Sequence, residues 1–464
     1  MDRRQFLKTV ATSAIGIAAG SCAFADSKNS KTPNIIFILV DDLGYGDLGC
    51  FGQKQIKTPD IDKMAAEGMR FTNHYAGSTV CAPSRCSLMT GLHTGHCRIR
   101  GNSRLPVKAE DVTVAEVLKT AGYKTGLIGK WGLGEEGSVG IPNKKGFDYF
   151  FGYLNQRHAH NYYTDYLWRN TEKVKLKNEV VYKDKFGSAA TKRVEYSNDL
   201  MTDEALSFVE KNKDDKFFLY LAYTIPHANN ESGLVNKHGM EVPDLGIYKD
   251  RDWPAPQKAH AAMITRMDGY VGKLIDKLKK LGIDDDTVVF FTSDNGPHAE
   301  GGAKPNFFNS RGPLRGIKRS LHDGGIRVPM IVRWPGKIKA GSVSDLPGAF
   351  WDFMPTAAEL ASVSAPDDTD GISFVAALTG KDQKQKKHEF LYWEFHEGGF
   401  FQAVRYGQYK ALRKGLEGKI RLYDLEKDIH EDNDIAESRP AVVEKIKQYL
   451  KNARTYSEYF KAKK

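Results

Sequence analysis

The chain has 464 residues, of which 68 are Lys or Arg and 58 are Asp or Glu, so its formal net charge is +10. An ordinary hydrophobic content of 41% and the lack of an apolar run of about 20 residues exclude collagen-like, disordered and multi-span membrane proteins. Five cysteines are too few for a disulfide-based scaffold, and the length suits one large domain with a smaller partner.

The N-terminal segment is typical of an export signal. Arg3 and Arg4 form a twin-arginine pattern, a weakly apolar stretch follows, and residues 23–25 offer small side chains to a signal peptidase. We therefore expect residues 1–25 to be a twin-arginine signal peptide, which the twin-arginine export machinery uses to deliver the protein to the periplasm. An alternative is a lipid anchor attached through Cys22.

Apolar strands alternate with amphipathic helices along most of the chain. We predict strands at 34–40, 123–128, 217–223 and 287–292, and helices at 113–120, 203–211 and 263–278. The first strand is a continuous apolar run, as in a sheet covered on both faces, and each strand ends near polar residues. The alternation predicts an α/β fold with a large, mostly parallel sheet flanked by helices. In such sheets, ligands bind beyond the carboxyl ends of the strands.

The composition changes after about residue 365. Short alternating strands are expected at 390–395, 401–405 and 409–412, and a closing amphipathic helix at 442–450. We therefore predict a large α/β domain over residues 32–365 and a smaller C-terminal α+β domain over residues 380–464.

Two predicted strand ends carry hard oxygen donors. Asp41 and Asp42 follow the first strand, and Asp294 and Asn295 follow the strand at 287–292. Carboxylate and amide oxygens suit calcium or magnesium rather than zinc, so we expect a metal site at this edge of the sheet. For either pair alone, the alternative that it only caps the next helix would be preferred.

A cysteine near a predicted helix start is the second candidate feature. Pro83 and Ser84 can open a helix, which would place Cys81 at its N-terminus, where backbone N–H groups favour an anion. Arg85 adds a fork of donors for an oxyanion. The alternatives are that Cys81 is a buried apolar residue or half of a disulfide.

These residues resemble the signature of the formylglycine-dependent sulfatases in the alkaline phosphatase superfamily. That signature is Cys-x-Pro-Ser-Arg followed by Thr-Gly, and Cys81, Pro83, Ser84, Arg85, Thr90 and Gly91 match it. The resemblance extends to Asp41-Asp42, Gly129-Lys130-Trp131, Pro226-His227, Ser293-Asp294-Asn295-Gly296, Gly316-Ile317-Lys318 and residues 324–329. It implies an alkaline-phosphatase-like fold, with the catalytic domain at 32–365, and is strongest for bacterial exported carbohydrate sulfatases.

The resemblance also implies a modified nucleophile and a metal. A formylglycine-generating maturation enzyme would oxidise Cys81 to 3-oxoalanine (formylglycine), and its hydrate would attack the sulfur of a sulfate monoester. The metal would be Ca²⁺ rather than Mg²⁺. Its ligands would be Asp41, Asp42, Asp294, Asn295 and the modified Cys81.

Basic residues complete the implied site. By the resemblance, Arg85 and Lys130 would hold the hydrate and the sulfate, and Lys318 would contact sulfate and the leaving-group oxygen. His227 would be the general acid, although a lone His at a strand end is often structural. Three basic residues and a divalent cation outweigh three aspartates, which favours an anionic substrate.

One position departs from the family pattern. Lys130-Trp131 is usually followed by His, which helps to deprotonate the second hydroxyl of the hydrate, but this chain has Gly132. Water or another residue would then take over that step. We expect His160, with His158 as the less favoured choice, to fill part of this vacancy or to bind the sugar of the substrate.

The small domain offers candidate sugar ligands. Glu394, His396 and Arg405 could supply hydrogen bonds beside the aromatic surface of Trp393 and Phe395. The alternative is that the two aromatic residues belong to the core of a strand.

Three functions follow from the sequence. The first is hydrolysis of a sulfated glycan, with a galactose- or N-acetylgalactosamine-type 4-sulfate as the expected substrate. The second is a phosphatase or phosphodiesterase of the same superfamily, which the intact Cys81 signature disfavours. The third is an inactive sulfate-binding relative, which only Gly132 favours. No basic-aromatic motif indicates nucleic acid as a partner.

Overall fold

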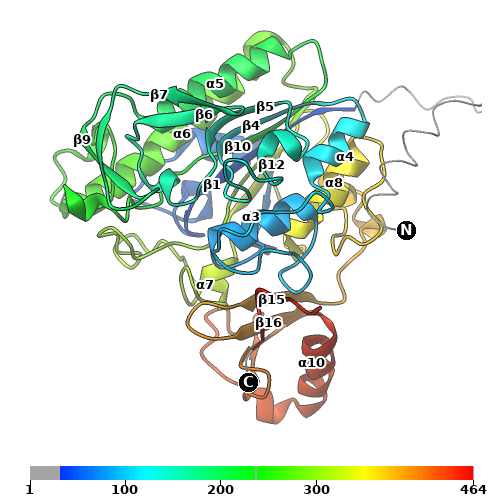
Figure 1. Ribbon diagram of the computed structural model, residues 1–464. Helices are drawn as coiled ribbons and strands as arrows, with labels where there is room; N and C mark the ends of the chain where they lie inside the picture. Colours follow the sequence, from blue (N-terminus) through cyan, green and yellow to red (C-terminus); the bar gives the residue numbers. More distant parts are fainter. Residues whose placement is uncertain (1–31, 236–237, 463–464) are drawn as a thin grey trace, which may run out of the picture.

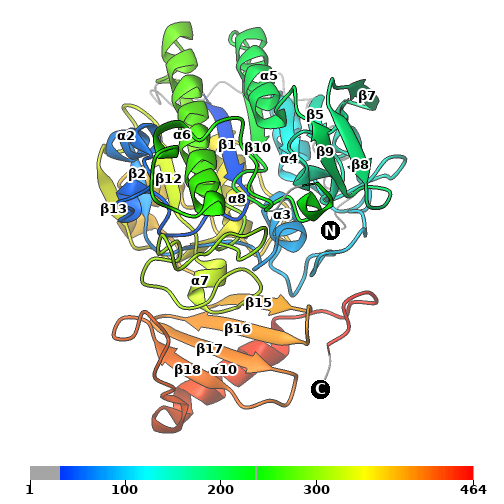
Figure 2. The same cartoon turned by 90° about the vertical axis from the view of Figure 1, so that its left-hand side faces the viewer.

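The computed structural model describes residues 32–235 and 238–462, so the predicted signal peptide at 1–25 and Cys22 lie outside the described residues. The described residues form a large domain and a small domain that lies below it in Figures 1 and 2. None of the helices described is both long enough and apolar enough to cross a membrane. The cysteines at 50, 81, 86 and 97 are free thiols.

The large domain is built on a ten-stranded sheet. In spatial order its strands are β13 (Ser342–Ser344), β2 (Met69–Phe71), β12 (Met330–Arg333), β11 (Thr287–Ser293), β1 (Asn34–Val40), β10 (Phe217–Ala222), β4 (Lys124–Lys130), β5 (Tyr149–Tyr153), β6 (Tyr166–Arg169) and β7 (Glu172–Lys175). The strands from β11 to β5 run parallel and form the centre of the sheet. Antiparallel pairings lie on either side of them. The predicted α/β fold with a mostly parallel sheet is confirmed.

Helices cover both faces of this sheet (Figure 1). One layer contains α2 (Pro59–Glu67), α5 (Ser197–Lys211) and α6 (Ala255–Leu281), and the other contains α3 (Cys81–Thr90), α4 (Val114–Thr120) and α8 (Phe353–Leu360). In β1, Ile36 and Ile38 pack in the first layer, whereas Ile35 and Phe37 pack in the second. Successive side chains of a strand point to opposite faces, so a continuous apolar run is what a doubly covered strand requires.

Two short ladders and two short helices complete the large domain. Their bounds are β3 (His74–Tyr75) paired with β14 (Gly348–Ala349), β8 (Glu179–Tyr182) paired with β9 (Ser188–Lys192), α7 (Asp323–Ile326) and α9 (Val375–Leu378). The chain passes into the small domain between α9 and the next strand.

The small domain is a four-stranded antiparallel sheet with one helix. Its elements are β15 (Leu391–Phe395), β16 (Phe401–Tyr406), β17 (Tyr409–Lys414), β18 (Arg421–Asp424) and α10 (Pro440–Asn452). The helix packs on one face of the sheet through Ile446 and Leu450. The other face turns Trp393 and Phe395 toward Trp351 of the large domain, and Figure 2 shows α7 next to β15. Trp393 and Phe395 are therefore core residues between the domains, not an exposed aromatic surface for a sugar.

A buried lysine joins the two domains. Lys410 of β17 donates a hydrogen bond from Nζ to Asp323 Oδ1 at 2.6 Å, and its Nζ lies 3.2 Å from Glu431 Oε1. All three side chains are fully buried. Burial alone would raise the pKa of Asp323, but the charges of Lys410 and Arg327 outweigh it and lower the pKa to about 2.

We expect Lys410→Met to lower the free energy of unfolding by about 3–5 kcal/mol, because it leaves two buried carboxylates without their shared cation. Thermal unfolding at pH 7 measures this loss. Lys419→Met is the matched control, since its ion pair with Glu437 is exposed, and it should change stability by less than about 0.5 kcal/mol.

The same ion cluster predicts a pH dependence. The folded pKa of Asp323, about 2, is below its ordinary value of 3.8. Its contribution to stability is therefore full above the ordinary pKa and is lost as the pH falls from about 4 toward 2. The difference in stability between wild type and Lys410→Met should shrink over this range, and a constant difference would contradict the assignment.

Candidate functional site

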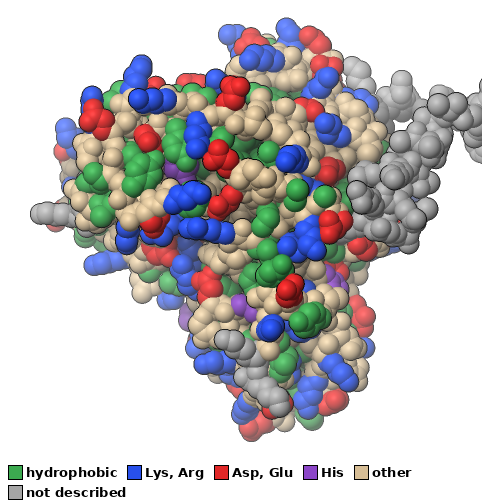
Figure 3. Space-filling model, in the orientation of Figure 1, with side chains coloured by type: hydrophobic (Ala, Val, Ile, Leu, Met, Phe, Trp, Pro, Cys, Tyr) green, Lys and Arg blue, Asp and Glu red, His purple; other side chains and the backbone are tan. Residues whose placement is uncertain are grey.

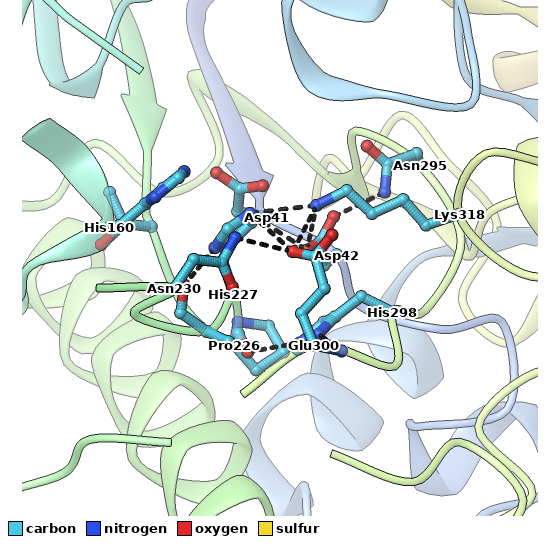
Figure 4. A network of polar contacts seen from close by, with 12 residues as sticks. Asp41, Asp42, His160, Pro226, His227, Asn230, Asn295, His298, Glu300 and Lys318 are labelled. Carbon is cyan, nitrogen blue, oxygen red and sulfur yellow. Dashed lines mark hydrogen bonds and ion pairs between the residues drawn. The ribbon is translucent and has the colours of Figure 1, made fainter. Parts of the chain in front are cut away.

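Nine of the predicted site residues meet at the carboxyl edge of the parallel strands. They are Asp41 and Asp42 after β1, Cys81 and Arg85 of α3, Lys130 at the end of β4, His227 after β10, Asp294 and Asn295 after β11, and Lys318 in the loop before α7. All of them are buried. Figure 4 shows Lys318 and His227 reaching Asp41 and Asp42 from different segments of the chain.

The acidic residues form one compact oxygen cluster. Carboxylate oxygens of Asp41, Asp42 and Asp294 lie within 4.8 Å of one another. Asn295 Nδ2 donates to Asp42 Oδ1 at 2.7 Å, and the backbone N–H of Asp42 donates to Asp294 Oδ1 at 3.2 Å. Asp42 has a φ of +66°, which is unfavourable for a residue with a Cβ and is found preferentially at functional sites.

Two oxygens of this cluster indicate that it can hold a cation. Asp41 Oδ1 and Asn295 Oδ1 are buried and have no hydrogen-bond partner among the described residues. A buried acceptor without a partner is costly, and a hard divalent cation would satisfy both. The pKa of Asp294 is raised to about 7 by burial and by the charge of Asp41, which reflects crowding of negative charge that a cation would relieve.

Three basic side chains counter the aspartates. Lys130 Nζ donates to Asp41 Oδ2 at 2.6 Å, and Arg85 donates to Asp294 Oδ2 from Nη2 at 2.8 Å. Burial favours the neutral acid at Asp41, yet the charges of Lys130 and Arg85 hold its pKa well below the usual range. Lys318 Nζ donates to Asp42 Oδ2 at 2.8 Å.

His227 and Lys318 form a proton-sharing pair. His227 Nδ1–H donates to the carbonyl of Ala228 at 2.7 Å, which leaves Nε2 as an acceptor for Lys318 Nζ at 3.0 Å. Burial and the nearby charge of Lys318 put the pKa of His227 well below its ordinary value, whereas Asp42 raises the pKa of Lys318 despite burial. The proton between the two groups therefore resides on Lys318.

Glu300 belongs to the site and was missed from the sequence. Its Oε2 lies 3.4 Å from Lys318 Nζ and 3.8 Å from His227 Nε2, and Asn230 donates to the same oxygen at 3.0 Å. Burial opposes ionisation, but Lys318 dominates and the pKa of Glu300 is lowered to about 2. The only sequence signal was its position six residues beyond Asp294.

Cys81 begins α3 beside the acidic cluster. Its sulfur lies within 4.8 Å of ligand atoms of Asp41 and His227. Burial raises the pKa of the thiol to about 12, although Lys130 acts in the opposite direction. The unmodified residue is thus an uncharged thiol at neutral pH, and a thiol is a poor nucleophile compared with a thiolate.

The space beside Gly132 is occupied by Gln156. Gly132 has a φ of +77°, and a Cβ on it would lie 2.8–2.9 Å from the end of the Gln156 side chain. His160 lies elsewhere, with its ring stacked on His227 at a centroid distance of 4.7 Å. His158 is buried against Tyr166, and burial lowers its pKa to about 3. Gln156, and not a histidine, therefore occupies the space beside Gly132, and the expectation that His160 takes over part of the role of the missing imidazole stays a prediction.

The predicted sugar ligands of the small domain have structural roles. Glu394 is fully buried and accepts hydrogen bonds from Arg100 at 3.0 Å and Arg454 at 2.9 Å. His396 contacts Glu394 through Nε2 at 3.0 Å, and Arg405 donates to the hydroxyl of Tyr75. Because these groups bond within the protein and none contacts the acidic cluster, we withdraw Glu394, His396 and Arg405 as sugar ligands.

The small domain contacts the edge of the site through an ion pair. Arg319, next to Lys318 in the chain, forms ion pairs with Glu300 and with Glu397 of the small domain. Sequence reasoning missed Arg319, because nothing local marks it as a site residue.

Comparisons with known proteins agree with this geometry. The Sulfatase family matches residues 33–363, and "N-sulphoglucosamine sulphohydrolase, C-terminal" matches residues 317–456. An N-acetylgalactosamine-6-O-sulfatase of Bacteroides thetaiotaomicron is 31% identical, over 93% of this chain and 94% of that protein. An N-acetylgalactosamine-6-sulfatase of Mus musculus is 33% identical, over 82% of this chain and 72% of that protein. The crystal structure of Ps i-CgsB in complex with k-i-k-neocarrahexaose superimposes with a TM-score of 0.77 at 28% identity, covering 93% of this chain and 95% of that one.

Proposed function

The chain belongs to the sulfatase family of sulfuric ester hydrolases, and we propose that it removes sulfate from a sulfated carbohydrate, with N-acetylgalactosamine 6-sulfate as the first candidate. The observation that carries this proposal is the meeting of Cys81 with the acidic cluster and three basic side chains. The names of two relatives support position 6 of the sugar. The 4-sulfate expected from the sequence stays a prediction and is the second candidate.

We propose that Asp41, Asp42, Asp294 and Asn295 hold a calcium ion, together with residue 81 after its conversion to formylglycine. The unpartnered oxygens of Asp41 and Asn295 support this donor set. When bound, the cation would supply Lewis acidity, and hydrated formylglycine would supply the attacking oxygen. Magnesium is the less favoured metal, because it demands a more rigid octahedral arrangement.

The side chains around residue 81 would bind the sulfate and control one proton. Lys130 and Arg85 present positive charge from a buried position, where electrostatic interactions are stronger than in water. Lys318 and His227 hold one proton between Nζ and Nε2, 3.0 Å apart. We propose that this pair gives the proton to the leaving-group oxygen, with Lys318 as its resting place and His227 as the general acid through which it passes.

His160 stays in the proposal as a sugar-contacting residue, since it stacks on His227 and is partly exposed. The maturation enzyme, the twin-arginine export machinery, the periplasmic location and the alternative anchor at Cys22 remain predictions. A phosphatase or an inactive relative is disfavoured by Cys81 beside an intact acidic cluster.

A screen for released sulfate tests the function. We expect N-acetylgalactosamine 6-sulfate to be hydrolysed with a kcat/KM at least about tenfold above that for the 4-sulfate, because one pocket cannot place both esters at residue 81. A phosphate monoester of the same sugar should release no phosphate. Faster hydrolysis of the 4-sulfate would overturn the choice of position, and release of phosphate alone would overturn the sulfatase proposal.

A further inference from the structure

The helix that carries the nucleophile has no capping side chain at its own N-terminus. The N-cap residue of α3 is Val80, whose side chain has no hydrogen-bond acceptor. A capping side chain normally accepts from the second or third N–H of a helix, and the third residue of α3 is Pro83, which has no N–H. Ala82, the residue after Cys81, therefore supplies the only N–H at these two positions.

Asn102 supplies the missing cap from another segment of the chain. Its Oδ1 accepts a hydrogen bond from the N–H of Ala82 at 3.3 Å, across 20 residues of sequence. We refer to residues 93–102 as the cap loop. The first turn of a helix frays readily without a cap, and residue 81 is the first residue of that turn. The position of Cys81 therefore depends on the cap loop.

A buried arginine two residues before Asn102 fixes the cap loop. Arg100 is 2% exposed, and its guanidinium donates four hydrogen bonds, each at 3.0 Å. The acceptors are the carbonyl of Cys97, Oε1 of Glu394, and both the carbonyl and the hydroxyl oxygen of Thr455. Two of the four bonds thus go to a residue that follows the last helix.

The chain after α10 lies along the cap loop. We refer to residues 453–460 as the C-terminal segment. The N–H of Thr455 donates to the carbonyl of Gly95 at 3.0 Å, and a Cβ on Gly95 would overlap the carbonyl oxygen of Ala453. The two backbones are therefore in direct contact, which a glycine at position 95 permits.

Aromatic contacts continue this attachment up to Asn102. The guanidinium of Arg98 lies 5.1 Å from the centre of the Tyr459 ring, and the ring of Phe460 lies beside Gly101, the residue before Asn102. Figure 1 shows the C-terminal segment, in red, beside β15 and β16. Figure 3, drawn from the same side, shows the two domains in contact beneath α3. The end of the cap loop is thus held between α3 and the C-terminal segment.

The start of the cap loop is attached to the large domain instead. The backbone N–H of His93 donates to Asp370 Oδ2 at 2.9 Å, and His96 Nδ1 lies 2.8 Å from Asp370 Oδ1. Because this end of the loop is fixed independently, a loss of the C-terminal contacts should affect mainly residues 98–102. These residues include the cap itself.

We propose that Asn102 is a positioning residue for the nucleophile, and that the C-terminal segment holds Asn102 in place through Arg100. This inference rests on the proposed sulfatase function and extends it. It gives the small domain a role in the chemical step, in place of the sugar contacts withdrawn above.

Variants of Asn102 test the positioning. In Asn102→Ala we expect kcat to fall by about tenfold and KM to change by less than about twofold, because the nucleophile is displaced while the binding groups stay in place. Asn102→Asp should recover most of kcat, since a carboxylate accepts the same hydrogen bond. Each rate is divided by the fraction of residue 81 that mass spectrometry finds as formylglycine, so that incomplete maturation does not contribute.

A direct contact with the sugar is the competing role for Asn102, which is exposed. A small aryl sulfate has no sugar and separates the two roles. Positioning requires a similar loss of kcat in Asn102→Ala for 4-nitrophenyl sulfate and for sulfated N-acetylgalactosamine. A loss confined to the sugar substrate, or an effect on KM alone, would overturn the proposal.

A double-mutant cycle tests the C-terminal segment. Arg100→Lys keeps the charge beside Glu394 but loses the fork that reaches Thr455, so kcat should fall by about fivefold. In the Asn102→Ala background the same change should lower kcat by less than about twofold, because the connection is already broken. Multiplicative losses in the double variant would exclude this connection. If Arg100→Lys fails to fold, which its unfolding temperature shows, Thr455→Ala replaces it in the cycle. Tyr456→Ala is the matched control, since this side chain of the same segment is 81% exposed, and it should keep kcat.

Hydrogen exchange gives a readout that needs no turnover. Peptides that cover the first turn of α3 should exchange at least about threefold faster in Asn102→Ala than in wild type, and at the wild-type rate in Asn102→Asp. If wild type hydrolyses no sulfate ester, the proposed function fails, and exchange alone decides this inference. Unchanged exchange in Asn102→Ala would overturn the positioning role whatever the activity.

Discussion

A Cys81→Ala protein is expected to fold like the wild type and to lose sulfate-ester hydrolysis by at least about 10⁴-fold. Cys81 starts α3 with its sulfur within 4.8 Å of ligand atoms of Asp41 and His227, so any nucleophile made from it lies among the charged groups. Its thiol is protonated at neutral pH, because burial raises its pKa to about 12. The proposed nucleophile is a modified residue 81, and alanine cannot be modified in this way.

The mass of the peptide that contains residue 81, and a variant of a neighbouring cysteine, test this prediction. In active wild-type protein, the tryptic peptide of residues 71–85 should be lighter than its thiol form, by the difference between a thiol and an aldehyde. Cys86→Ala is the matched control, since Cys86 is also a buried thiol of α3 but packs in the hydrophobic core. It should keep its activity. Full activity in protein whose residue 81 is entirely a thiol would contradict the proposed chemistry.

The second large effect is expected for Asp41→Asn. This change keeps the shape of the side chain but removes its negative charge. That charge pairs with Lys130 at 2.6 Å, and one of the two carboxylate oxygens has no hydrogen-bond partner among the described residues. We expect kcat/KM to fall by at least about 10³-fold, because both the cation and the position of Lys130 depend on Asp41. Sulfate release from N-acetylgalactosamine 6-sulfate measures this loss.

Calcium binding provides a readout that is independent of turnover. At about 100 times its dissociation constant, calcium should stabilise wild type by about 2.7 kcal/mol, and this gain should be much smaller in Asp41→Asn. Asp268→Asn is the matched control, because Asp268 is also buried but accepts hydrogen bonds from the backbone N–H groups of Asp60 and Ile61 in α2. It should lower stability by about 1 kcal/mol and keep the calcium response. An undiminished calcium response in Asp41→Asn would remove Asp41 from the metal site.

Glu300 and Arg319 add an ion pair to the electrostatics of the site. The three aspartates balance Arg85, Lys130 and Lys318, and the ionised Glu300 is paired with Arg319. The proposed divalent cation would add two positive charges and give the site a net attraction for a sulfate monoester.

The sequence by itself determined the sheet and the residues at its edge. The run from Ile35 to Val40 is apolar at every position, which is typical of a strand covered on both faces. Because the parallel strands share one carboxyl edge, Asp41 and Asp294 had to come close together despite 252 intervening residues. The hydrophobic pattern and the strand direction are local properties, so they could be predicted without a partner.

Only the tertiary structure decided which polar groups already have hydrogen-bond or ion-pair partners within the protein. Glu394 is of a residue type that often binds sugars, but it is buried and accepts hydrogen bonds from two arginines that are distant in the sequence. The residue type of Gln156 did not predict that it fills the space at Gly132, where its amide has no hydrogen-bond partner among the described residues. Glu300 reaches the site because its loop folds back onto Lys318. Side-chain partners depend on contacts between distant segments, and no local pattern encodes those contacts.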